Sequence, residues 1–284
     1  MKKFFYVLMA AAALVAVSCD KEGTNGGENG GNEDAATKKV LTAIASKVDE
    51  YGNFVKGWKF NYHEDGKVAE MIEQKEDGSV DWNLKYSWNG TTVTVNEVWE
   101  GENGPEEGLY CTYTVGANGY FTECVKGSTT YWYEYDEEGH LTKIYEDWGE
   151  GKTVVSIVTW EDGNMTSWSK EGESKVDENN PGTEEEPNKI TPVKHQTYQT
   201  DLNVAGIFTA YPEKGNIKKW MMNLGMFGKP SKNLVDTDKW NYYTSANTAE
   251  FEYRTDDDEF VVAEVKYFAG ELDDETYFLW ETAE

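Results

Sequence analysis

Positive charge is scarce in this 284-residue chain. Its 26 Lys and Arg residues face 53 Asp and Glu residues, which gives a formal net charge of −27, and Arg254 is the only arginine. Nucleic-acid phosphates need a basic patch, so this balance argues against a nucleic-acid partner and against polyanionic ligands. Proline is rare at 6 residues, and the 3 cysteines are too few for a disulfide-stabilised scaffold.

The apolar run at the N-terminus is too short for a transmembrane helix, which needs about 20 residues. Residues 4–17 form an uncharged apolar run that follows Lys2 and Lys3. A short apolar run behind a positive start is typical of a secretory signal peptide. We therefore predict a signal peptide over residues 1–18.

The signal peptide ends in Ala16-Val17-Ser18-Cys19, which resembles the lipobox of bacterial lipoproteins. The resemblance implies that Cys19 carries lipid and anchors the chain to a membrane, because several acyl chains give a stable anchor. The alternative is an ordinary signal peptide with an incidental cysteine. Acidic residues beside Cys19 resemble the surface-export signal of Bacteroidota lipoproteins. This favours an outer-membrane, surface-exposed location over a periplasm-facing anchor.

Residues 19–39 are rich in Gly, Asn and Glu, a composition that predicts a flexible tether. The rest of the chain is rich in aromatic residues, which make up 14 % of the sequence and which disordered chains lack. We expect a single β-rich domain over residues 40–284. A low-complexity segment at 171–189 is interpreted as a long loop inside it, with a domain linker as the alternative.

From about residue 55 the chain repeats an extended stretch, a turn with Gly, and a second extended stretch. Residues 60–68, 113–121 and 133–141 are three copies. In each, the Gly lies four residues after an aromatic residue or Val that should face inward. This spacing predicts a three-residue loop with the Gly in the left-handed conformation.

The pattern predicts an all-β fold: a long antiparallel meander of about 12–14 strands, curled into a barrel-like sheet so that its edges are protected. The stretches carry charge at many alternate positions and mean hydropathy is −0.72, so we expect the sheet to stand in water rather than span a membrane. Near the C-terminus, Val261, Ala263 and Val265 should share the buried face, and Glu264 should face the opposite side.

One short helix is predicted near residues 217–224. Asn216 is the expected N-cap and Gly225 the expected residue after the C-terminus. The stripe of Ile217, Trp220, Met221 and Leu224 should cap the sheet core; a ligand gate is the alternative.

The run Tyr-Asp-Glu-Glu-Gly-His-Leu-Thr at 135–142 looks like YD-type repeats. The order of lipobox, aromatic hairpins, Leu202-Asn203, short helix and the Gly-Lys-Pro-Ser-Lys-Asn-Leu run at 228–234 resembles a Bacteroidota lipoprotein family of unknown function with a porin-like β fold. The resemblance covers about residues 40–284. It implies one barrel-like domain on a surface lipoprotein and offers no catalytic residues.

Catalytic motifs are absent from the sequence. His63-Glu64 lacks the second His of a zinc protease, no Gly-x-Ser-x-Gly elbow exists, and residues 225–230 do not match a phosphate loop. The acidic run 256–259 lacks EF-hand spacing and is better explained as a solvated turn than as a calcium site. We therefore expect no catalytic residues, no metal, no cofactor and no enzymatic activity.

Cys111 and Cys124 flank the predicted hairpin at 113–121. A three-residue loop would place them on opposite faces, which predicts free, buried thiols. A two- or four-residue loop would allow a bridge.

The remaining candidates for binding are tryptophans spread over neighbouring hairpins, because aromatic faces bind sugar rings and apolar ligands. The candidate ligand-binding residues are Trp88, Trp99, Trp132, Trp148, Trp160 and Trp168, with core packing as the alternative. The hypothesis is a non-catalytic, lipid-anchored outer-membrane lipoprotein that binds a small neutral ligand, either a glycan or an apolar molecule, on an aromatic-rich β-sheet. A structural or protein-interaction surface lipoprotein is the alternative, and a hydrolase is less favoured.

Overall fold

The structure is a computed structural model that describes residues 39–169, 194–212, 214–242 and 245–282. The predicted signal peptide, Cys19, residues 19–38 of the predicted tether and the segment 171–189 lie outside the described residues. Lys39, assigned to the tether from the sequence, is the first residue of β1.

The described residues form one closed barrel of antiparallel strands in sequence order. The strands are β1 (Lys39–Val48), β2 (Phe54–Tyr62), β3 (Val68–Gln74), β4 (Val80–Asn89), β5 (Thr92–Gly101), β6 (Gly104–Val115), β7 (Phe121–Lys126), β8 (Thr129–Tyr135), β9 (Leu141–Asp147), β10 (Thr153–Glu161), β11 (Asn164–Ser169), β12 (Lys194–Leu202), β13 (Asn233–Tyr242), β14 (Ser245–Thr255), β15 (Val261–Phe268) and β16 (Glu271–Thr282).

The barrel closes where β1 pairs with β16, for example at Ile44↔Phe278. The strands on either side of residues 170–193 pair directly, with Ser167 opposite His195. The predicted all-β barrel-like meander is therefore confirmed, but it has 16 strands rather than 12–14. Part of the difference lies at the N-terminus, where β1 precedes the first hairpin that the sequence pattern marks.

The predicted loop geometry is confirmed at the three repeated hairpins. Gly66, Gly119 and Gly139 have positive φ values of 79°, 84° and 93°. In the second hairpin the N–H of Gly116 donates to the carbonyl of Tyr120, which closes a three-residue loop. Only Gly adopts this conformation without a steric cost, so these residues set where the strands reverse.

Aspartates at the start of several turns stabilise them further. Asp49, Asp77, Asp136 and Asp256 each accept a hydrogen bond from the backbone N–H of the residue two or more positions later. Such Asx turns satisfy backbone donors that the strands leave unpaired. These four acidic residues therefore have a structural role at hairpin turns.

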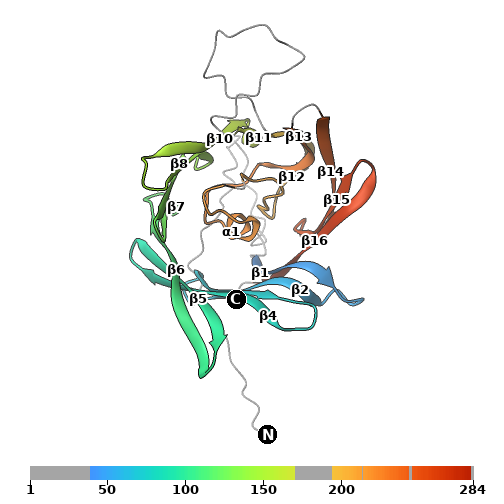
Figure 1. Cartoon of the computed structure of the whole chain (residues 1–284). Helices are drawn as coiled ribbons and strands as arrows, with labels where there is room; N and C mark the ends of the chain where they lie inside the picture. Colours follow the sequence, from blue (N-terminus) through green and yellow to red (C-terminus); the bar gives the residue numbers. More distant parts are fainter. Residues whose placement is uncertain (1–38, 170–193, 213, 243–244, 283–284) are drawn as a thin grey trace, which may run out of the picture.

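The segment between β12 and β13, residues 203–232, turns into the barrel instead of crossing directly, and we call it the plug. Figure 1 shows its short helix α1 (Lys219–Asn223) inside the ring of strands. Large apolar side chains of the plug are buried: Ile207, Phe208, Ile217, Trp220, Met221, Met222, Met226 and Phe227. A barrel of 16 strands is wide enough to hold an aqueous channel, so the plug supplies the core that the wall cannot fill.

Helix α1 is shorter than predicted and begins differently. Its N-cap is Lys218, without a side-chain cap, whereas Asn216 has a left-handed φ of 60° and points its amide elsewhere. The predicted end is confirmed, because Gly225 follows the C-cap Leu224 with φ 70°. No helix among the described residues is long and apolar enough to cross a membrane.

The antiparallel order gives the barrel two distinct ends. The start of β1, the finish of β16 and both connections of the plug lie at one end, which we call the plug end. The turns that follow β1, β3, β5, β9 and β15 lie at the opposite end, which we call the far end.

Candidate functional site

Three of the six candidate tryptophans belong to the core. Trp88 packs against the main buried cluster, and Trp160 and Trp168 belong to a smaller cluster with Met165. Trp88 also donates from Nε1 to the carbonyl of Val68 at 2.8 Å. These three rings therefore stabilise the barrel.

The other three tryptophans do not share a surface. Trp132 alternates with inward-facing tyrosines on β8, and its Nε1 donates to the Glu123 carboxylate at 2.9 Å. Trp99 and Trp148 are 45 % and 65 % exposed and lie at far-end hairpins. The structure thus does not bring the six residues together, and only Trp99 and Trp148 present much of their rings to solvent.

The far end carries most of the exposed large apolar side chains. Those at or beside its turns are Tyr51, Val80, Trp99, Trp148 and Leu272. Trp99 leans over the Cα of Gly108 on the neighbouring strand, where an added Cβ would lie 2.8 Å from the ring. Residue 108 must therefore be small for Trp99 to hold this position.

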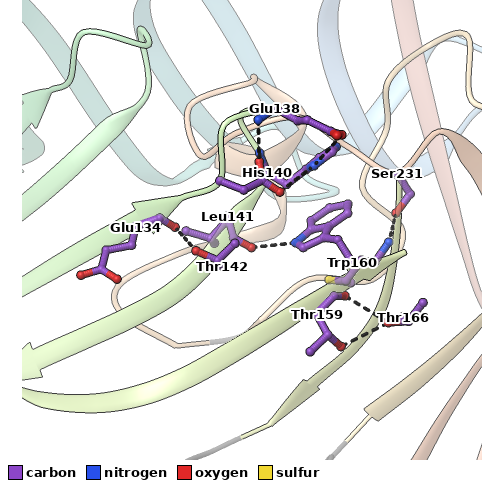
Figure 2. A network of polar contacts seen from close by, with 11 residues as sticks. Glu134, Glu138, His140, Leu141, Thr142, Thr159, Trp160, Thr166 and Ser231 are labelled. Carbon is purple, nitrogen blue, oxygen red and sulfur yellow. Dashed lines mark hydrogen bonds and ion pairs between the residues drawn. The ribbon is translucent and has the colours of Figure 1, made fainter. Parts of the chain in front are cut away.

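At the plug end, a buried histidine marks the seam between the plug and the wall. The ring of His140 stacks on Trp160, with centroids 4.3 Å apart and planes at 17°. Figure 2 shows the Trp160 indole beside it, donating to the Leu141 carbonyl at 2.8 Å. The Nδ1 atom of His140 lies 3.1 Å from the Asp136 carboxylate. Although His140 follows a hairpin turn, the hairpin folds over the barrel end and buries the ring.

Asp136 is held ionised by this arrangement. Burial raises the pKa of Asp136, but hydrogen bonds from the backbone N–H and the ring of His140 outweigh burial and keep the pKa below its usual value. The carboxylate is therefore an anchor for the turn that touches the plug.

Backbone hydrogen bonds join the plug to three hairpins of the wall. Met226 accepts from the N–H of Phe121, while the N–H groups of Lys229 and Lys232 donate to the carbonyls of Gly139 and Gly163 at 2.9 Å each. These bonds satisfy the polar backbone of an irregular segment that would otherwise be buried without partners. The plug is thus bonded to the wall much as a strand is bonded to a sheet.

The run 228–234, the most specific part of the family resemblance, is this seam. Ser231 Oγ accepts from the N–H of Met165 at 3.1 Å and lies 2.9 Å from the Tyr198 hydroxyl. The side chain of Asn203, at the entry of the plug, donates to the carbonyls of Ile207 and Ser231. Sequence reasoning assigned these residues no role, although the run was the signal that could have marked them.

Inside the barrel, an ion pair links the plug to the wall. Lys219 Nζ lies 2.9 Å from Glu264 Oε1, and the Glu264 residue is 3 % exposed. The prediction that Glu264 faces outward is wrong, because a register shift next to Thr255↔Val261 changes the face of the following residues. Glu264 instead lies opposite Tyr253, whose ring packs against the core.

The lumen leaves little free space beside the plug. One crevice, between α1 and β4–β6, has no free volume for a water molecule, and a second, beside Phe208 and Leu234, has about 10 Å³. Ligand pockets usually have about 300–1,000 Å³. The interior therefore offers no pocket of ordinary size among the described residues.

The first crevice is lined by Cys111, Asn216 and Met221. Cys111 and Cys124 are free and buried, as predicted, but they share the inward face. The loop at 116–120 has the predicted length, yet a register shift after Thr114 pairs Tyr113 with Cys124 and brings the two thiols to one side. The prediction of opposite faces is wrong because it assumed an unbroken register.

A family model and one similar solved structure agree with this architecture. The family model for a domain of unknown function (DUF4595) with porin-like fold matches residues 60–263. A porin-like protein from Bacteroides uniformis is similar in structure, with a TM-score of 0.56 and 13 % identity over 86 % of this chain and 98 % of that chain. A porin-like protein from Bacteroides vulgatus is 14 % identical over 85 % of this chain and 98 % of that chain, with a TM-score of 0.29. No curated protein matches this chain.

Proposed function

The chain belongs to the DUF4595 family of porin-like fold, and we propose that it is a non-catalytic, lipid-anchored cell-surface barrel that binds neutral glycans at its far end. The observation that carries this proposal is the filled lumen. Because Trp220, Met221, Met222 and Phe227 occupy the interior, a partner has access to the outside and the ends of the barrel.

The outer wall supports a barrel that stands in water. Outward side chains of β2, β3, β4 and β6 form polar contacts: Asn61 and Asn83 donate to the Glu70 carboxylate at 2.8 and 3.0 Å, and Lys85 pairs with Glu107. Charged and amide side chains suit water and are costly against lipid tails. A lipid anchor at Cys19 would then supply the attachment to the membrane.

The position of the first residue of β1 supports a ligand-binding surface at the far end. Lys39 begins β1 at the plug end, so a tether that connects Cys19 to Lys39 joins the barrel there. Trp99 and Trp148 lie at the opposite end, facing away from that attachment.

The chemistry of the far end suits a neutral sugar. Trp99 is followed by Glu100, and Trp148 lies between Asp147 and Gly149, close to Glu150. Aromatic faces stack on the apolar faces of sugar rings, while carboxylates accept hydrogen bonds from their hydroxyls. The net charge of −27 opposes polyanionic glycans.

Binding of the full chain to a panel of neutral and anionic glycans tests the proposal. We expect a neutral glycan to bind and Trp99→Ala or Trp148→Ala to weaken it by about 2- to 12-fold, the loss of one aromatic contact. Leu272→Ala, an exposed far-end residue without a ring, is the matched control and should bind normally. The proposal would be contradicted if no neutral glycan bound. It would also be contradicted if both tryptophan variants bound as tightly as the natural protein.

A further inference from the structure

Two buried thiols and a thioether lie around Tyr113 inside the barrel. The Tyr113 hydroxyl lies 3.9 Å from Met221 Sδ and accepts a 3.0 Å hydrogen bond from Asn216 Nδ2, which also lies 3.5 Å from Cys124 Sγ. Cys111 lies two residues before Tyr113 on the same inward face, and Cys124 is the cross-strand partner of Tyr113. The wall supplies both thiols and the plug supplies the thioether and the amide.

The spacing of the thiols disfavours a disulfide. Tyr113 is the direct cross-strand partner of Cys124, so Cys111 is the diagonal neighbour of Cys124. Diagonal residues have Cα atoms about 7–8 Å apart, whereas a disulfide needs about 4.4–6.8 Å. Two metal–sulfur bonds of about 2.3 Å allow the sulfurs to stand about 4.6 Å apart. An ion between the thiols therefore fits this placement better than a covalent bond.

The donor set is soft and small. Two thiolates and a thioether favour Cu(I), whereas structural Zn²⁺ sites take four nitrogen or sulfur ligands. Within the described chain, no three His, Cys, Asp or Glu side chains come together as a harder metal would require.

The side chains around the thiols supply a positive charge. Lys126 lies nearby, and its ammonium group donates to the Tyr110 hydroxyl at 2.7 Å. Its positive charge would offset the excess negative charge of a monovalent ion held by two thiolates.

We propose that Cys111, Cys124 and Met221 form a binding site for a monovalent soft metal ion, Cu(I), between the barrel wall and the plug. Binding replaces both S–H protons, so two protons leave as one Cu⁺ enters and the site gains one net negative charge. Asn216 positions the ligands by its contact with Cys124.

The test uses the full chain with Cys19→Ser, which removes the only other thiol, reduced and without oxygen. Cu(I) is added with bathocuproine disulfonate as competitor, and native mass spectrometry counts the ions retained. We expect one copper per chain, lost in Cys111→Ser and in Cys124→Ser. Asn216→Ala should weaken retention by about 10- to 100-fold, as outer-shell changes do.

Met221→Leu keeps the volume of the side chain and removes the sulfur, so it tests the site even where a cysteine variant folds poorly. It should retain copper less well than Met222→Leu, the matched control, whose buried side chain lies beside it on α1. Equal retention by these two variants would overturn the assignment of Met221. Folded protein that binds no copper, or that loses about 2 Da to a disulfide in oxidised glutathione, would overturn the site.

Discussion

The N–H of Lys229 donates to the carbonyl of Gly139 at 2.9 Å, so the plug is hydrogen-bonded to the tip of the β8–β9 hairpin. One residue earlier, Gly228 passes so close to the same carbonyl that an added Cβ would lie 2.7 Å from it. This contact requires a glycine and holds the plug against the wall. The seam is therefore part of the folded core and not a loose insertion.

Gly228→Ala should destabilise the protein more than Gly225→Ala. Both glycines have positive φ, 99° and 70°, but only Gly228 has neighbours that a Cβ would strike. We expect a loss of about 1–2 kcal/mol for Gly225→Ala from backbone strain alone, and a larger loss for Gly228→Ala. Urea unfolding of the two variants measures the difference, and equal losses would refute the close contact.

Lys219→Met should cost about 3–5 kcal/mol, because it leaves the buried Glu264 carboxylate without its cation. Glu264 Oε2 has no hydrogen-bond partner in the described structure, so Lys219 carries much of the compensation. The double variant Lys219→Met, Glu264→Gln should regain most of the loss. Unfolding midpoints of the four proteins give the coupling; additive effects would show that the pair does not act together.

Local chemistry made the hairpins predictable, while the plug depends on distant contacts. Gly66, Gly119 and Gly139 mark their turns in the sequence because few other residues adopt positive φ. The apolar stripe of α1 has the same pattern whether a helix lies outside a sheet or inside a barrel, so its place in the lumen could not be read from the stripe. Asn216 resembles an N-cap in sequence, but the Cys124 thiol that its amide contacts is 92 residues away along the chain.

Register shifts account for two wrong predictions about the site. An extra residue reverses the face of everything that follows, and neither shift carries a clear residue signature. Cys124 therefore joins Cys111 on the inward face, and Glu264 turns toward Lys219. Whether Trp99 and Trp148 are exposed also depends on how the barrel closes. The sequence alone therefore could not separate exposed tryptophans from buried ones.

Asp136→Asn should reduce stability at neutral pH but not in acid. Because the folded-state pKa of Asp136 is lowered, its ionised form contributes stability above the unfolded pKa, and this contribution is lost as pH falls through the folded pKa. The stability gap between the natural protein and the variant should be present at pH 7 and close below about pH 4. Urea midpoints across this range measure it, and a gap that is constant with pH would contradict the charge effect.

Cys19→Ala should abolish membrane attachment if the lipid anchor is correct. Without the thiol there is no site for acyl chains, so the protein should stay unprocessed or become soluble. Membrane fractionation of cells that express each form measures this. Unchanged fractionation of the variant would remove the anchor from the proposed function.

Hydrogen exchange of the plug amides in the full chain tests the filled barrel most directly. The amides of Met222, Leu224 and Lys229 are hydrogen-bonded within the plug or to the wall. If the plug is part of the core, these amides should exchange as slowly as those of β6–β9, through global unfolding. Exchange of the plug that is orders of magnitude faster than exchange of the wall would mean that the lumen opens, and would contradict the sealed barrel.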